Sequence, residues 1–472
     1  MSGVNGNRKI VITCIRYLLL CCANTSLAGQ LPDIQLWASE HFEAYVDYLH
    51  QRPFIIYALS YLENHMQECG EDMQISGHLA QLRGQLSHLK NPISYIFGNC
   101  IPRSWCLGAA ANDRHNSHDA RRILGLLLHT AIRMQYSQVV EALLVAGAEV
   151  ETRQDGRTAL IAAAERGDQA TVQVLLDRSA FVGATNDINQ TALHLAASNG
   201  HTAAVGLLIG RNAEMEAEDA EDRKALHLAA ADGHTGVVEL LIDQGADKEA
   251  KDKEEQRAIH LAAANGHAAV VELLVDRGAD REAKDAEQQR ALHLAAAKGH
   301  NHIIELLVSQ GADKEAKDAL GWQALHIAAW KGHVGTIRML IQALGANKEA
   351  KESHGWTALH VAGISGQDAV VQLLVEDLGA NIGARDDAGW NVLHLVAALG
   401  FMNTTQLLTE TLKMDKKAWN MKGQTALKLA QKQYVVGTPI ITQWWENLVL
   451  NRVYLTVCVF NPLEYRFLVT LG

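Results

Sequence analysis

The chain has 472 residues, of which 48% are hydrophobic and 20% are charged, and its formal net charge is −11. This composition is typical of globular proteins and excludes a fully disordered chain. The acidic balance, without a basic stripe in the sequence, argues against a domain that follows nucleic-acid phosphates. Residues 107–438 contain neither proline nor cysteine, which excludes a disulfide-stapled scaffold over that interior.

The first 120 residues do not repeat and are predicted to form two segments. Residues 1–100 carry apolar side chains at helical spacing, which predicts a small helical region. Residues 101–120 are rich in Ala, Asn and Ser, which is typical of a linker. Residues 1–28 also resemble a signal peptide, and that alternative stays open. Because Arg16 interrupts the apolar run, we favour a packed helix there.

A repeat dominates residues 121–434. The string Ala-Leu-His, or a close variant, recurs with its histidine every 33 residues, and the spacing lengthens to 34 in the last copies. The histidines of this structural motif are His194, His227, His260, His293, His326, His360 and His394. Degenerate copies extend the array to about nine units plus a partial one. We expect the extra residue of the longer copies to lie in their loops.

Each unit is predicted to contain two short helices and a turn. In one copy, the small residues 225–230 suit a first helix, and Gly233 ends it. Residues 237–241 place Val and Leu on one face of a second helix, and Gly245 supplies its C-cap. The charged residues 248–252 follow. One such pair cannot bury its own apolar face, so the pairs must stack.

These residues resemble the ankyrin repeat. The period, the Gly-His between the helices and the Gly-Ala-Asp loop match that family, as does Thr-Ala-Leu-His at 191–194 and 357–360. The resemblance covers about two thirds of the chain. It implies an all-α ankyrin-repeat solenoid, preceded by the small helical region. It also implies that the concave face and the hairpin fingers bind other proteins, without enzymatic activity.

The sequence departs from the family pattern at two positions. The hairpin glycine becomes Asn189, Asp222, Glu255 and Gln288 in the middle of the array. Since residues other than glycine tolerate positive φ poorly, we predict less regular or more mobile fingers around residues 220–290. Alanine (valine in one copy) replaces the family's proline at the start of the first helix. This predicts less stable units, because proline restricts the unfolded chain.

The sequence contains 22 histidines, a residue type that often binds metal ions. Helices that stack lie about 8–10 Å apart, so equivalent imidazoles cannot share one ion. We predict instead a ladder of imidazoles that bond the backbone of neighbouring loops. The sequence contains no P-loop, no nucleophile elbow and no His-Glu-x-x-His motif. We therefore predict no catalytic, cofactor-binding or metal site.

One residue in each finger, directly after the glycine position, is predicted to point outward and to contact protein partners. Along the chain these residues are Arg157, Gln190, Arg223, Gln256, Gln289, Trp322, Trp356 and Trp390. Trp330, at the end of a first helix, is expected to join them. Exposed tryptophans often anchor interfaces. The alternative left open is that these tryptophans pack on the next finger.

Residues 435–472 break the repeat and form an apolar tail. We expect the tail to cap the last unit, and a membrane-touching segment is the alternative. No run of 18 apolar residues occurs, so no membrane span is predicted. Residues 1–100 resemble the helical segment between the NACHT module and the ankyrin array of fungal NLR-like proteins. That likeness implies the sensor part of a signalling NTPase.

The main expectation is a non-enzymatic scaffold for protein–protein interaction that is monomeric, lies in the cytoplasm or the nucleus, and binds no nucleic acid. The first alternative is the regulatory portion of an NLR-like NTPase. A weaker alternative is a substrate adaptor for a ubiquitin ligase. The sequence does not identify the partner protein.

Overall fold

The computed structural model describes residues 47, 50–51, 116–145 and 147–429. Nearly all of the predicted helical region 1–100 and the whole tail 435–472 lie outside the described residues. The signal-peptide, NACHT-associated and capping predictions fall there as well. The first described helix begins at Asn116, inside the segment that we expected to be a linker. In the described part of the chain, no helix is long and apolar enough to cross a membrane.

Pairs of short helices make up the described residues, which contain isolated β-bridges but no β-strand. Two compact units divide the chain, residues 1–229 with 239–246 and residues 230–238 with 247–472, and each is described by itself. In the first unit the pairs are α6 (Asn116–Arg133) with α7 (Ser137–Val145), α8 (Ala159–Arg166) with α9 (Gln169–Asp177), and α10 (Ala192–Ser198) with α11 (Thr202–Gly210). The boundary between the units runs through α12 (Ala225–Ala231) and α13 (Thr235–Asp243).

The second unit continues the same pattern. Its pairs are α14 (Ala258–Asn265) with α15 (Ala268–Asp276), α16 (Ala291–Lys298) with α17 (Asn301–Ser309), α18 (Ala324–Lys331) with α19 (Val334–Arg338), α20 (Ala358–Ile364) with α21 (Asp368–Gln372), and α22 (Val392–Leu399) with α23 (Met402–Gln406). Three π-helices extend the last second helices: η3 (Met339–Ala343), η4 (Leu373–Asp377) and η5 (Leu407–Thr411).

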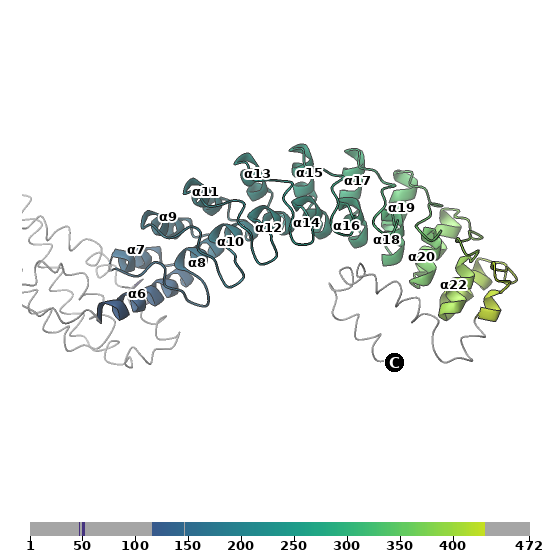
Figure 1. Cartoon of the computed structure of the whole chain (residues 1–472), viewed down its shortest axis with the longest axis horizontal. Coiled ribbons are helices and arrows are strands. Elements are labelled where there is room, and N and C mark those ends of the chain that lie inside the picture. Colours follow the sequence, from purple (N-terminus) through teal and green to yellow (C-terminus); the bar gives the residue numbers. More distant parts are fainter. Residues whose placement is uncertain (1–46, 48–49, 52–115, 146, 430–472) are drawn as a thin grey trace, which may run out of the picture. The chain divides into compact units, whose positions relative to one another are not determined.

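Within each unit the first helices pack against one another in chain order, and the second helices form a second row (Figure 1). Small side chains let the first helices approach closely, as Ala291, Ala295 and Ala296 of α16 do, which are fully buried. The second helices contribute larger side chains, such as Ile303 and Ile304 of α17. Each such side chain stabilises the fold by about 1.5–3 kcal/mol. The apolar core therefore runs between the two rows, and the turns remain at the edge.

The extra residue of the 34-residue copies lies in a helix and not in a loop, so that expectation was wrong. The second helix of each longer copy ends in a π-helical turn. In η4, for example, the amide of Leu378 donates to the carbonyl of Leu373, five residues back, at 3.0 Å. A π-turn absorbs one inserted residue while the flanking α-helical turns keep their packing. The repeat therefore tolerates the insertion without a longer loop.

A nine-residue finger precedes each first helix from α10 onward. The fingers are residues 181–189, 214–222, 247–255, 280–288, 313–321, 347–355, 381–389 and 415–423. The prediction of irregular fingers around residues 220–290 was wrong in its structural part. The ninth residue takes a left-handed conformation both as Gln288, with φ 58°, and as Gly321, with φ 80°. Increased mobility of these fingers stays a prediction.

The sixth residue of each finger explains why the turn survives without glycine. The amide of the ninth residue donates to the carbonyl of the sixth, as Gln288 does to Asp285 at 3.0 Å. The carboxylate of Asp285 also accepts hydrogen bonds from the amides of Glu287, at 3.1 Å, and of Gln289, at 2.7 Å. Three hydrogen bonds thus offset the cost of about 1–2 kcal/mol that a side chain adds in this conformation.

Candidate protein-interaction surface

The motif histidines form the backbone-bonding ladder that the sequence predicted. Nδ1 of His293 accepts a hydrogen bond from the amide of Arg290 at 3.1 Å, and Nε2 lies 2.9 Å from the carbonyl oxygen of Ala316 in the next finger. His260 repeats both contacts one unit earlier. Because an amide donates to Nδ1, the ring proton resides on Nε2, which donates to the carbonyl. His260, His293, His326 and His394 thus each tie the start of a first helix to the following finger, whereas Nε2 of His360 is buried without a hydrogen-bond partner among the described residues.

Burial keeps these imidazoles neutral. It lowers the pKa of His260, His293, His326 and His360 to about 4, against the ordinary value of 6.5. The backbone hydrogen bonds raise the pKa only in part. A neutral, fully enclosed imidazole has no route to a solute, so this ladder is structural.

A second row of imidazoles follows the interhelical glycines and reaches backwards. Nε2 of His267 lies 2.9 Å from the carbonyl oxygen of Ala231, and Nε2 of His333 lies 3.0 Å from that of Ala297. The ring of His267 lies so close to Gly233, whose φ is +79°, that a Cβ there would collide with it. The described residues contain no cluster of His, Cys, Asp or Glu that could hold a metal ion. Both rows of histidines thus serve packing.

The outward orientation predicted for the finger residues was wrong for three of them. Trp322 and Trp356 are 7% exposed and Gln190 is 8% exposed. Trp356 Nε1 donates to the carboxylate of Asp386 in the next finger at 3.2 Å, and Gln190 reaches Asp219 in the same way at 3.4 Å. Trp322 packs edge-on against Trp330, with ring centroids 5.8 Å apart. These side chains pack on their neighbours, as the alternative held.

The remaining residues of that set differ in exposure. Arg157 is exposed and pairs with Glu165 at 2.6 Å. Arg223, Gln256, Gln289, Trp330 and Trp390 are half-buried. Arg223 forms an ion pair with the buried Asp219 at 2.9 Å. Whether any of these residues contacts a partner protein stays a prediction.

In the finger at 347–355, side chains at three positions bond to the next finger or to the end of the helix that precedes it. From the second position, Lys348 donates to the carbonyl of Leu378 at 2.6 Å. From the third, the carboxylate of Glu349 accepts from the amide of Asn381 at 2.8 Å. From the fifth, Lys351 donates to the carbonyl of Arg385 at 2.8 Å. The finger at 313–321 makes the same three bridges through Lys314, Glu315 and Lys317.

The junction between fingers 181–189 and 214–222, within the first unit, lacks these bridging residues. Its second, third and fifth positions are Val182, Gly183 and Thr185. The fingers nonetheless keep their register, because the amide of Ala220 donates to the carbonyl of Ile188 at 3.0 Å. The equivalent backbone bond joins Ala286 to Glu254. The side-chain bridges are therefore lost while the spacing of the fingers is kept.

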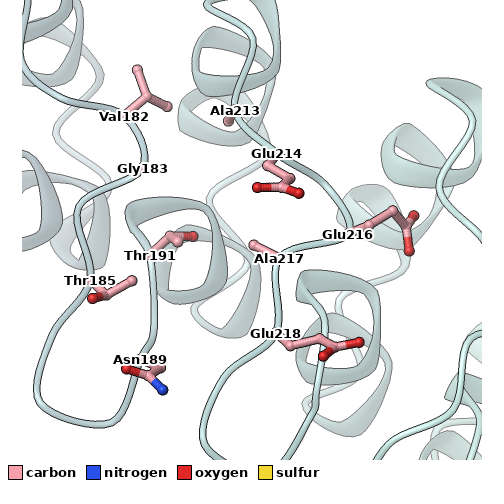
Figure 2. Close-up of a pocket in the computed structure, with 10 residues that line it drawn as sticks. All are labelled: Val182, Gly183, Thr185, Asn189, Thr191, Ala213, Glu214, Glu216, Ala217 and Glu218. Carbon is pink, nitrogen blue, oxygen red and sulfur yellow. The ribbon is translucent and has the colours of Figure 1, made fainter.

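A hollow of about 450 Å³ occupies this junction. Figure 2 shows Val182, Gly183 and Thr185 on one wall and residues 214–218 of the next finger on the other; the side chain of Glu214 lies between the walls, and that of Glu218 points away from Thr185. Glu214 and Glu218 are exposed, and Glu216 forms an ion pair with Lys224 at 2.8 Å. Phe181 and Ile188, at the two ends of the first finger, are 65% and 52% exposed. The hollow is thus acidic and flanked by apolar side chains.

Our reading of the sequence missed this site because it followed one finger position only. The signal appears when the fingers are aligned position by position. Lys or Arg then recurs at the second and fifth positions from residue 247 to residue 351. Val182, Thr185 and Glu218 break this pattern. A comparison of all nine positions across the units would have marked this junction.

The family of the chain follows from the fold and from a direct comparison. A family model of ankyrin repeats, three copies long, matches residues 128–219, 181–252, 207–285, 226–318, 259–352 and 292–386. These matches together span more than half of the chain, which therefore belongs to the ankyrin-repeat family. The all-α ankyrin fold predicted from the sequence is confirmed. A search of curated proteins finds no match.

Proposed function

We propose that this protein is a non-enzymatic scaffold that binds other proteins through its fingers. Ankyrin repeats are generally protein–protein interaction modules, and the family is typically non-enzymatic. The observation that supports the proposal most is that the histidines and the finger tips differ in burial. The motif histidines are buried and most of them bond to backbone carbonyls, whereas the finger tips at Ala286, Ala319 and Ala388 are exposed. The cytoplasmic or nuclear location and the monomeric state belong to the same proposal.

The proposal is tested by matched charge insertions. Ala286→Arg with Ala319→Arg places two bulky cations on finger tips, and Ala203→Arg with Ala269→Arg places two on the exposed faces of α11 and α15. Both pairs change the net charge equally and leave the core untouched. Partners captured by the full chain and identified by mass spectrometry should be lost with the finger pair and kept with the helix pair. Equal capture by both variants would contradict binding through the fingers.

The NLR-like and ubiquitin-ligase alternatives have no observation in the described residues that favours them. The first rests on residues 1–100, which lie almost entirely outside the described part of the chain. Both remain predictions from the sequence.

A further inference from the structure

The regular junctions define what the hollow between fingers 181–189 and 214–222 would accept. From finger 313–321 onward, the cation at the fifth position lies on the backbone carbonyl of the fifth residue in the next finger, whereas Lys251 and Lys284 bond to Glu255 and Gln288 of their own fingers. Lys317 reaches Lys351 O at 2.9 Å, Lys351 reaches Arg385 O at 2.8 Å, and Arg385 reaches Trp419 O at 2.6 Å. The equivalent pair in the hollow is Thr185 and Glu218. Threonine lacks the long stem that carries the ammonium of lysine across.

The third finger position defines a second contact that an occupant of the hollow would make. In the later fingers a glutamate accepts a hydrogen bond from the amide of the first residue in the next finger, as Glu315 does from Asn347 at 2.8 Å. In the hollow the equivalent residues are Gly183 and Glu214. Glycine has no side chain to accept that bond. The wall at residues 214–218 thus presents an amide that elsewhere donates to an acceptor, and a carbonyl that elsewhere accepts from a cation.

The negative charge of finger 214–222 favours a positively charged occupant. Finger 214–222 contains six acidic residues and no Lys or Arg, whereas each later finger carries at least one. Asp219 and Glu216 are paired with Arg223 and Lys224. Both Glu214 and Glu218 are exposed; the side chain of Glu214 lies in the hollow, whereas Glu218 lines it through its backbone (Figure 2). Lysine or arginine in a bound peptide would meet the backbone carbonyl of Glu218, as Lys317 and Lys351 meet a carbonyl in later fingers, and would lie near the carboxylate of Glu214.

The finger opposite this wall adds apolar surface. The first position is Asp or Asn in all fingers from residue 247 onward, but it is Phe181 here, and the eighth position is Ile188. Both side chains are largely exposed. An occupant with an apolar residue beside its cation would cover them, since exposed aromatic side chains are common anchors of interfaces.

We propose that the hollow between fingers 181–189 and 214–222 binds an extended peptide segment that carries a lysine or arginine next to an apolar residue. A peptide carbonyl accepts from the amide of Glu214, and the cation lies against the backbone carbonyl of Glu218 and near the carboxylate of Glu214. This inference rests on the proposed function and assigns it one site and one partner chemistry. It depends on residues that differ from those tested by the finger-tip insertions.

The test uses the full chain and a phage-displayed library of random peptides of about 12 residues. Enriched peptides should carry Lys or Arg beside an apolar residue. One such peptide is then synthesised and titrated against the wild type, Thr185→Lys and Gln310→Lys. Thr185→Lys introduces the lysine that later fingers use to reach the next finger. Its side chain should occupy the site and weaken peptide binding by about 10- to 100-fold. Gln310→Lys adds the same charge at an exposed position outside the fingers and should leave binding unchanged.

A second variant guards against misfolding of Thr185→Lys. Glu214→Gln removes the charge of the exposed carboxylate in the hollow, keeps the size of the side chain, and should weaken binding of the same peptide by about tenfold. Enrichment of acidic peptides, no enrichment at all, or equal affinity for the wild type and Glu214→Gln would overturn the inference. If the finger-tip pair still abolishes partner capture in those cases, the proposed function stands and only this site is wrong.

Discussion

Lys351 donates a hydrogen bond from Nζ to the backbone carbonyl oxygen of Arg385, 2.8 Å away, and so joins the fifth residues of two adjacent fingers. Such bridges hold the edge of the repeat together where no apolar core exists. Hydrogen bonds to a charged group contribute about 1.5–3 kcal/mol when they are well shielded and less at an exposed edge. They also occupy surface that a partner protein would otherwise reach. A junction without them is therefore open to a ligand.

The neutral histidine ladder predicts a loss of stability in acid. The pKa of His293 is about 4 in the folded protein and 6.5 in the unfolded chain, so the unfolded chain binds more protons between these values. The stabilising contribution is complete above pH 6.5 and is lost as the pH falls towards 4. An NMR titration should find the His293 ring uncharged at pH 5.5 in the folded protein and charged in urea. A ring that titrates near 6.5 in both states would refute the ladder.

The buried carboxylate of Asp285 predicts the opposite dependence on pH. Burial, and then the nearby charges of Glu287 and Asp318, raise the pKa of Asp285 to about 7. Since the folded value exceeds the unfolded one, the contribution is present below pH 4 and is lost as the pH rises through 7.

Asp285→Asn removes this cost and keeps the Oδ1 acceptor of the turn. We expect the variant to be about 1–2 kcal/mol more stable than the wild type at pH 8, with the gain vanishing at pH 4. Urea unfolding at the two pH values measures the gain. The matched control is Asp313→Asn, which changes an exposed finger carboxylate that likewise accepts from the amide two residues on. An equal effect of both substitutions would rule out burial as the cause.

Trp356 should behave as a core residue and not as a binding residue. It is 7% exposed and donates to Asp386, so Trp356→Ala should cost about 3–5 kcal/mol of unfolding free energy. Trp419 is 62% exposed, and Trp419→Ala should stay within about 0.5 kcal/mol of the wild type. Denaturant unfolding measures the free energy of both variants. Comparable losses would show that Trp356 is not a buried core residue.

The alanine that stands in place of proline offers a stabilising substitution. Arg290 precedes Ala291 with φ −104° and ψ 166°, a conformation that a following proline favours. Ala291→Pro should therefore raise the unfolding free energy by about 0.4–1 kcal/mol through the unfolded chain. Ala295→Pro, inside the same helix, should instead cost about 3 kcal/mol. Thermal unfolding measures both, and a destabilising Ala291→Pro would show that the enclosed site cannot hold the ring.

The sequence predicted the repeat, the helix pairs and the histidine ladder because each depends on a strict period. It could not place the extra residue of the longer copies, since a π-turn and a longer loop differ by hydrogen bonds such as that from Leu378 to Leu373. It misplaced Trp322 and Trp356 because the residue after a turn can face either solvent or the next finger. The hollow was missed because it depends on Thr185 and Glu218, which are close only after the fingers stack.

The peptide site between fingers 181–189 and 214–222 is the central claim, and hydrogen exchange tests it most directly. The full chain is followed by mass spectrometry with and without a saturating basic peptide from the selection. We expect slower exchange within residues 181–189 and 214–222, including the amide of Glu214, and unchanged exchange in fingers 313–321 and 347–355. Protection confined to those later fingers, or spread evenly over the whole array, would contradict the claim.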